Sequence, residues 1–133
     1  MNFVTIDDIK DFSNLIIKYV TMDVAPEVDS VDFERFESAE DFLEFLEENP
    51  DYVVDILYCD VEMGGMSGVD LAEHIRRHYH IGRRIRKMIF VTSYRRLRIE
   101  YDGQIVGKIS KPFDRNDIVS ATLELIDSIR ENP

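Results

Sequence analysis

The sequence contains one cysteine, Cys59, and no tryptophan. A single cysteine excludes an internal disulfide and fits a reducing compartment, so we expect a cytoplasmic protein. No apolar run approaches the roughly 20 residues of a membrane-spanning helix. The apolar start of the chain ends at Asp7 and Asp8, which excludes a signal peptide. We therefore expect no association with membranes.

Basic residues are also scarce, with 16 lysines and arginines against 27 acids and a net charge of −11. Such a charge repels nucleic acid backbones, so we expect no direct nucleic acid binding by this chain. The bases are concentrated: residues 76–98 hold nine bases and no acid, whereas residues 23–51 hold twelve acids and one base. Two interpretations stay open. The segments form oppositely charged solvated faces, or one face docks a partner or a second copy of the chain as a homodimer.

The 133 residues, 44% of them hydrophobic, suit one compact domain over residues 1–133. Short apolar segments typical of strands alternate along the chain with segments whose apolar residues have helical spacing. Strands are predicted over residues 2–6, 33–36, 56–59, 88–91 and 105–109, the first as a short buried strand and the second as a weak one. Helices are predicted between and after them, with Ser38, Ser67 and Asp114 as N-caps and a short, weakly apolar helix over residues 94–101. Residues 21–30 are predicted to form a surface loop.

Strands that alternate with helices predict a parallel sheet covered on both faces. Right-handed crossovers bring the carboxyl ends of all strands to one edge, where ligands bind in such folds. Asp7 with Asp8, Asp60, Thr92 and Lys111 each follow or end a predicted strand. We therefore expect these residues to meet in one pocket, although they are spread over a hundred positions.

Carboxylates that are brought together repel each other, and a divalent cation relieves that repulsion. An all-oxygen ligand set favours Mg²⁺, with Asp7, Asp8 and Asp60 as carboxylate ligands and the backbone carbonyl of Glu62 as a further ligand. Since Mg²⁺ keeps positions open for phosphate oxygens, Asp60 could attack a phosphorus atom and form an acyl phosphate. Lys111 would neutralise one phosphoryl oxygen and Thr92 would hydrogen-bond another. Each residue alone is commonly structural, a cap, a turn or a packed hydroxyl, and only the ordered set is specific.

The whole chain resembles a receiver domain of a two-component response regulator. The resemblance is carried by four stretches: residues 3–8 (FVTIDD), 55–68 (DILYCDVEMGGMSG), 89–93 (IFVTS) and 110–113 (SKPF). Residues 60–72 and 90–94 look most like the receivers of LytTR-type regulators.

The resemblance implies a flavodoxin-like three-layer α/β sandwich whose five-stranded parallel sheet has the order 2-1-3-4-5. It implies that Asp60 accepts a phosphoryl group from a sensor histidine kinase or a phosphotransfer protein, and that Lys111 and Thr92 sense that group. It also implies a cis peptide at Lys111–Pro112. The chain would then be a signalling switch and no enzyme beyond assisting its own phosphorylation and dephosphorylation.

Three departures from the family pattern concern how phosphorylation is sensed. Lys108 stands at the switch position where the family usually has an aromatic residue, and Gly64 stands where proline is frequent. The predicted helix over residues 94–101 is short and rich in arginine. By the same resemblance, Glu62 and Tyr94 occupy positions that tune the lifetime of the phosphoryl group.

Two other readings of the sequence stay open. One is a degenerate receiver that acts as a phosphorylation-independent interaction module, which Lys108 favours and the complete set of site residues opposes. The other is a haloacid-dehalogenase-like phosphatase, but that family needs an aspartate where this chain has Glu62. His74, His78 and His80 have metal-ligand spacing, but no cysteine or acidic ligand completes the set, so we interpret them as part of a solvated basic face.

Overall fold

The first four strands alternate with helices along the chain, as the apolar segments predict, whereas no helix separates the fourth strand from the fifth. The structure is a computed structural model that describes residues 1–132. Its elements are β1 (Asn2–Ile6), α1 (Lys10–Asp23), the 3₁₀ turn η1 (Ala25–Glu27), β2 (Asp32–Phe36), α2 (Ala39–Glu48), β3 (Val54–Cys59), α3 (Gly68–Arg77), α4 (Tyr79–Gly82), β4 (Ile85–Thr92), β5 (Ile105–Ser110) and α5 (Arg115–Glu131).

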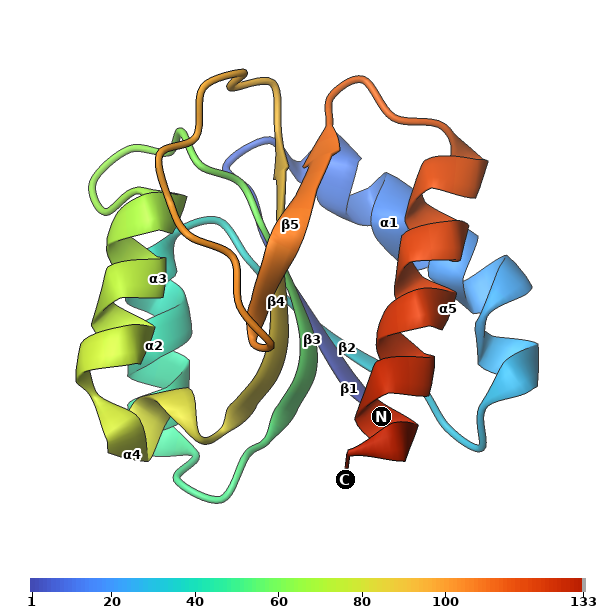
Figure 1. Cartoon of the computed structure of the whole chain (residues 1–133), viewed down its shortest axis with the longest axis horizontal. Coiled ribbons are helices and arrows are strands. Elements are labelled where there is room, and N and C mark those ends of the chain that lie inside the picture. The colour runs from blue at the N-terminus through green and yellow to red at the C-terminus, as the bar shows by residue number, and fades with distance from the viewer. Residues whose placement is uncertain (133) are drawn as a thin grey trace.

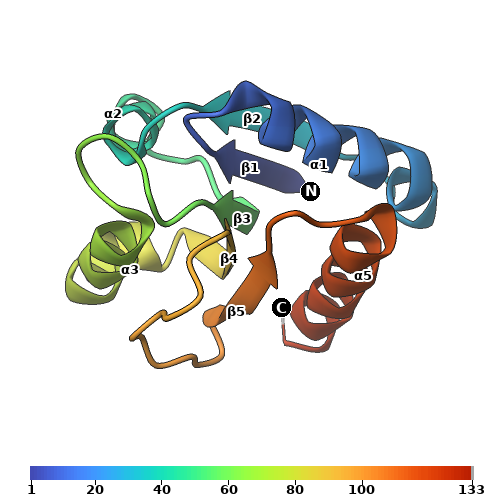
Figure 2. The same cartoon turned by 90° about the horizontal axis from the view of Figure 1, so that it is seen from above.

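All strands pair in parallel in one sheet of order β2-β1-β3-β4-β5. Helices α1 and α5 cover one face of the sheet, and α2, α3 and α4 cover the other (Figures 1 and 2). This confirms the flavodoxin-like three-layer sandwich. The strand order reverses direction at β1 and β3, which is where ligands bind in sheets of this kind.

The central strand β3 supplies side chains to both cores because its residues alternate between the faces. Leu57 and Cys59 join the core under α2 and α3, while Ile56 and Tyr58 join the core under α1 and α5. The Tyr58 hydroxyl lies 2.6 Å from the Thr122 hydroxyl in that second core, so its polar end is hydrogen-bonded inside the apolar layer. Burial raises the pKa of the Cys59 thiol, so this residue is a small apolar core side chain and a poor nucleophile.

The predicted N-caps of three helices are confirmed. The Ser38 side chain accepts the amide of Asp41 at the start of α2. Ser67 with Asp70 and Asp114 with Asp117 form reciprocal capping boxes at the starts of α3 and α5. The predicted loop over residues 21–30 is partly wrong, because α1 continues to Asp23 and η1 follows it. Over residues 1–132, no helix combines the length and apolarity that a bilayer span requires.

The predicted helix over residues 94–101 is wrong: residues 93–104 form an irregular segment, which we call the basic loop. Arginines at positions 95, 96 and 98 crowd like charges into a segment too short to be helical without tertiary support. The ammonium group of Lys108 on β5 also donates to the carbonyls of Tyr94 and Arg95, at 3.3 and 3.2 Å. In a helix those two carbonyls would accept amides four residues further on, so Lys108 satisfies them in an extended path instead.

Replacing Lys108 by Met should loosen the start of the basic loop while leaving the fold intact. Losing about 1 kcal/mol of local hydrogen bonding should speed amide exchange there about fivefold. We expect this acceleration at the amide of Tyr94, which donates to the Thr92 hydroxyl, measured by hydrogen–deuterium exchange. Lys87→Met is the matched control, because the Lys87 ammonium donates to Gly103 at the other end of the loop. Unchanged exchange of the Tyr94 amide in the Lys108 variant would show that the loop does not depend on this contact.

Candidate phosphoryl and metal site

Two buried carboxylates and one buried ammonium meet at the carboxyl ends of β1, β3 and β5. The Lys111 ammonium lies 2.7 Å from a carboxylate oxygen of Asp7 and 3.1 Å from one of Asp60. Asp7 is 5% exposed and Asp60 is 6% exposed. These residues are up to 104 positions apart in the sequence. The parallel sheet brings them together because each follows the carboxyl end of a strand.

Backbone hydrogen bonds that continue the sheet hold each of these residues in place. The amide of Asp60 donates to Ile6 at 2.9 Å, and the amide of Asp7 donates to Phe36 at 3.1 Å. The amide of Lys111 donates to Thr92 at 2.9 Å. Each site residue is therefore the first one past its strand and remains tied to the neighbouring strand. The positions are fixed by the sheet and not by flexible loops.

Burial sets the charge balance of the site. Removal from water raises the pKa of Asp7, and the neighbouring Asp60 carboxylate raises it further. The hydrogen bonds from Lys111 and from the amide of Ile9 act in the opposite direction. The Lys111 ammonium also lies 4.0 Å from the centre of the Phe12 ring, whose face attracts a cation. The sequence placed Phe12 only on the apolar face of a helix, and no motif signals this second contact.

The acidic residues fit a hard divalent cation. Carboxylate oxygens of Asp7, Asp8 and Asp60 lie within 4.8 Å of one another, with Asp8 exposed at the rim. Such an all-oxygen set suits Mg²⁺. The adjoining cavity has a volume of about 400 Å³, and its lining includes Asp8, Asp60, Glu62, Ser93 and Lys111. That cavity has room for a phosphoryl group next to Asp60.

The remaining predicted site residues surround this centre. Thr92 is buried, and its hydroxyl accepts the amide of Tyr94 at 3.1 Å. Tyr94 is 43% exposed and lines a neighbouring cavity together with Glu62 and the basic loop. The Lys111–Pro112 peptide bond is cis. Lys108 faces the basic loop and contacts the residues directly after Thr92.

Two residues that sequence reasoning did not single out shape the turn after Asp60. A Cβ atom on Gly68 would lie 2.1 Å from the carbonyl oxygen of Asp60, so only glycine lets α3 begin this close to the site. The carboxylate of Glu40 on α2 accepts the amide of Met66 at 3.1 Å and holds the same turn from the outside. The sequence does carry one signal of this close approach, because a glycine is an unfavourable residue at the start of a predicted helix and Gly68 stands there.

A family model shows the family of this chain, and solved structures share its fold. Residues 3–123 match the family model described as the response regulator receiver domain. A two-component transcriptional regulator AraC from Clostridium phytofermentans ISDg has a TM-score of 0.75 at 18% identity, covering 98% of this chain and 96% of that one. A CheY-like receiver domain protein from Methanospirillum hungatei JF-1 has a TM-score of 0.72 at 19% identity, covering 98% of both chains.

The receiver domain of the hybrid histidine kinase CckA has a TM-score of 0.70 at 18% identity, covering 95% of this chain and 99% of that one. At these identities the solved structures support the fold alone. A comparison with curated proteins gives no match.

Proposed function

Since this chain belongs to the response regulator receiver domain family of two-component signalling, we propose that Asp60 is its phosphoryl acceptor. Receiver domains are signalling modules that bind Mg²⁺ at an acidic pocket. The observation that carries the proposal is the buried cluster of Asp7, Asp60 and Lys111, with the cavity beside Asp60. A structural role alone does not require two buried carboxylates to share one ammonium.

The roles of the individual residues follow from their chemistry and their positions. One carboxylate oxygen of Asp60 accepts the amide of Val61 at 2.7 Å, which orients the carboxylate. The other oxygen, which contacts Lys111, is the proposed nucleophile. Mg²⁺ held by Asp7, Asp8, Asp60 and the Glu62 carbonyl would neutralise charge on the incoming phosphoryl oxygens. Lys111 would then move its ammonium from the two carboxylates to a phosphoryl oxygen, a shift of a few ångströms.

Thr92 and Lys108 are the proposed link from the site to the surface. The Thr92 hydroxyl can donate to a phosphoryl oxygen while its backbone neighbours stay tied to Lys108 through the Tyr94 and Arg95 carbonyls. A shift at Thr92 would therefore reach the basic loop through these contacts and not through an aromatic side chain. Tyr94 and Glu62 flank the cavity and would tune the access of water to the phosphoryl group.

The proposed phosphodonor is a sensor histidine kinase or a phosphotransfer protein, since receiver domains in general interact with these. We also propose that residues 1–133 form a single receiver domain, of the LytTR-type subgroup that residues 60–72 and 90–94 resemble. A homodimer remains part of this proposal because acidic and basic residues occupy separate segments of the chain.

The proposal is tested by incubating the protein with a small acyl phosphate and Mg²⁺ and measuring intact mass. We expect a single phosphoryl adduct in the wild type, loss of that adduct in Asp60→Asn, and strong reduction when Mg²⁺ is chelated. Asp51→Asn is the matched control, because Asp51 is an exposed acid in the turn before β3. An adduct that persists in Asp60→Asn would place the acceptor elsewhere. No adduct in the wild type would instead support a phosphorylation-independent interaction module.

A further inference from the structure

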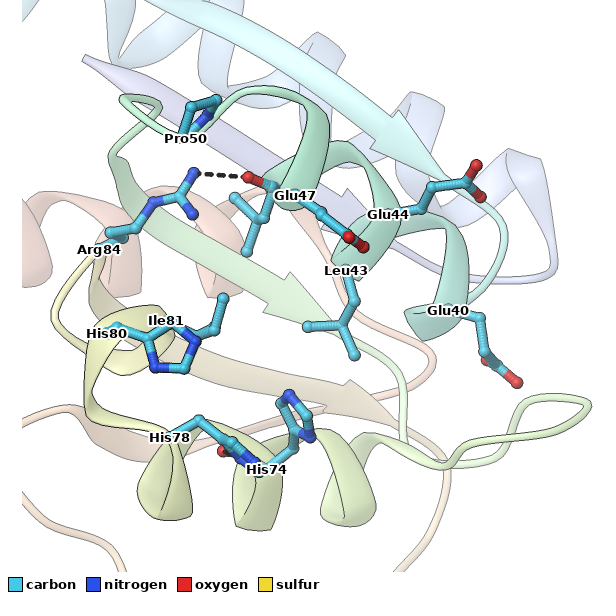
Figure 3. A pocket seen from close by; sticks show the side chains of 11 residues that line it. Glu40, Leu43, Glu44, Glu47, Pro50, His74, His78, His80, Ile81 and Arg84 are labelled. Carbon is cyan, nitrogen blue, oxygen red and sulfur yellow. Dashed lines mark hydrogen bonds between the residues drawn. The ribbon is translucent and has the colours of Figure 1, made fainter.

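A second cavity, of about 680 Å³, lies between α2 and the α3–α4 segment, and none of the acidic site residues lines it (Figure 3). Three imidazoles line one side of it: His74 on α3, His78 between the two helices and His80 on α4. Figure 3 shows the rings of His74 and His80 directed into the cavity. Three glutamates of α2 line the opposite side, Glu40, Glu44 and Glu47.

The three imidazoles form one contiguous cluster. The rings of His74 and His78, one helical turn apart, stack with centroids 4.1 Å apart and an interplanar angle of 22°. The centroid of the His80 ring lies 6.2 Å from that of His78. Two histidines at positions i and i+4, followed by a third two residues later, bring three nitrogen ligands from seven consecutive residues. Imidazole nitrogens are the ligands that zinc, copper and nickel prefer.

One ring is already oriented in the way that metal-binding histidines are. The Nδ1 atom of His78 lies 2.9 Å from the carbonyl oxygen of His74. A carbonyl oxygen only accepts, so this contact requires the proton on Nδ1 and leaves the lone pair of Nε2 free. A hydrogen bond from the second ring nitrogen to a backbone carbonyl is the usual support of a histidine ligand.

The fold supplies the acidic side that the sequence lacks near these histidines. Glu40, Glu44 and Glu47 come from a segment about 30 residues earlier in the chain and make the surroundings of the cavity negative, which attracts cations. The carboxylates of Glu40 and Glu44 are directed away from the imidazoles (Figure 3), and that of Glu40 accepts the amide of Met66. Arg84 also lines the cavity, but its guanidinium group donates to the carbonyls of Leu46, Asn49 and Tyr52. That arginine is therefore engaged in holding the end of α2.

We propose that His74, His78 and His80 bind one divalent transition metal ion, with zinc as the representative, at a site separate from the acidic one. Among residues 1–132, only Asp7, Asp8 and Asp60 already offer ligand atoms within 4.8 Å of one another. Bringing the nitrogens together requires rotation about the side-chain bonds of His74 and His80, of which His80 is exposed, while His78 keeps its contact with the His74 carbonyl. Water completes the tetrahedral shell, and the bound ion would cross-link α3 to α4.

The test is titration of tag-free protein with zinc chloride by isothermal calorimetry, together with thermal unfolding with and without zinc. We expect one ion per chain and a higher melting temperature with zinc. His78→Gln and His80→Gln should each weaken binding by at least about 10-fold, since loss of even an outer-shell partner costs about 10–100-fold. Both variants should unfold at the wild-type temperature when zinc is absent.

Asp8→Asn is the control that separates the two sites, because Asp8 belongs to the acidic cluster. Zinc binding that survives in Asp8→Asn and is lost in His80→Gln would support the histidine site. Zinc binding that is lost in Asp8→Asn, or that is equal in all variants, would overturn it, as would no binding at millimolar zinc. The outcome is independent of whether Asp60 is phosphorylated.

Discussion

Replacing Lys111 by Met is expected to lower the free energy of unfolding at neutral pH by about 3–5 kcal/mol, the usual cost of removing one partner from a buried ionic cluster. The ammonium group is the contact that Asp7 and Asp60 share, at 2.7 and 3.1 Å, and all three side chains are more than nine-tenths buried. Without it, two buried carboxylates face each other with no countercharge. Urea unfolding followed by circular dichroism measures the change.

Added Mg²⁺ and a lower pH should each restore part of the stability that Lys111→Met loses. A cation bound by the acidic cluster replaces the missing charge, so millimolar Mg²⁺ should stabilise Lys111→Met more than the wild type. The pKa of Asp7 is already raised in the folded protein, and loss of Lys111 should raise it further. A carboxyl group with a raised pKa binds protons more tightly when folded, so its unfavourable contribution is present above that pKa and fades as the pH falls through it. The stability gap to the wild type should therefore narrow below neutral pH and close towards the unfolded-state pKa of 3.8.

Lys10→Met is the matched control for Lys111→Met. Lys10 pairs with Glu37 at 3.1 Å, but the two side chains are 63% and 55% exposed. Solvent screens such a pair, so its loss should change stability by less than about 1 kcal/mol. Equal stability of Lys111→Met and the wild type, with or without Mg²⁺, would mean that the buried carboxylates do not depend on this ammonium.

Gly68→Ala is expected to destabilise the protein by about 1–3 kcal/mol and to slow formation of the Asp60 adduct. The added Cβ would lie 2.1 Å from the carbonyl oxygen of Asp60 and 3.0 Å from the Cα atom of Val61. Both are backbone atoms and cannot move aside as a side-chain end can, so either α3 or the end of β3 must shift. A shift at β3 displaces the carboxylate that the proposal makes the nucleophile.

Urea unfolding and the rate of adduct formation from an acyl phosphate measure the two effects of Gly68→Ala. Gly64→Ala is the control, since a Cβ at Gly64 meets no atom within 4 Å. Its stability should stay within about 0.5 kcal/mol of the wild type. If both alanine variants behaved alike, the close approach of α3 to Asp60 would have no energetic consequence.

The parts of the fold that the sequence predicts are those set by local pattern and by topology. Alternating apolar segments predict the strands and the large helices, and the position of Asp7, Asp60 and Lys111 at strand ends predicts that they lie together. The sequence-based predictions are wrong or incomplete where contacts between distant segments determine the structure. The helix expected over residues 94–101 is lost partly because Lys108, from the next strand, takes carbonyls that a helix would use. The Phe12 ring beside Lys111 and the glutamates across the cavity from the three histidines likewise depend on helix positions that no local pattern carries.

The two strands at the rims of the sheet restrict how copies of this chain can associate. Asp32, Glu34 and Arg35 are exposed on β2, and Lys108 is exposed on β5. Charged side chains along an edge strand oppose the addition of a further strand, because the incoming backbone would have to strip water from them. Growth of the sheet from molecule to molecule, the first step towards fibrils, is thereby disfavoured at both rims. A homodimer of this protein would therefore be built from its helices or its basic loop.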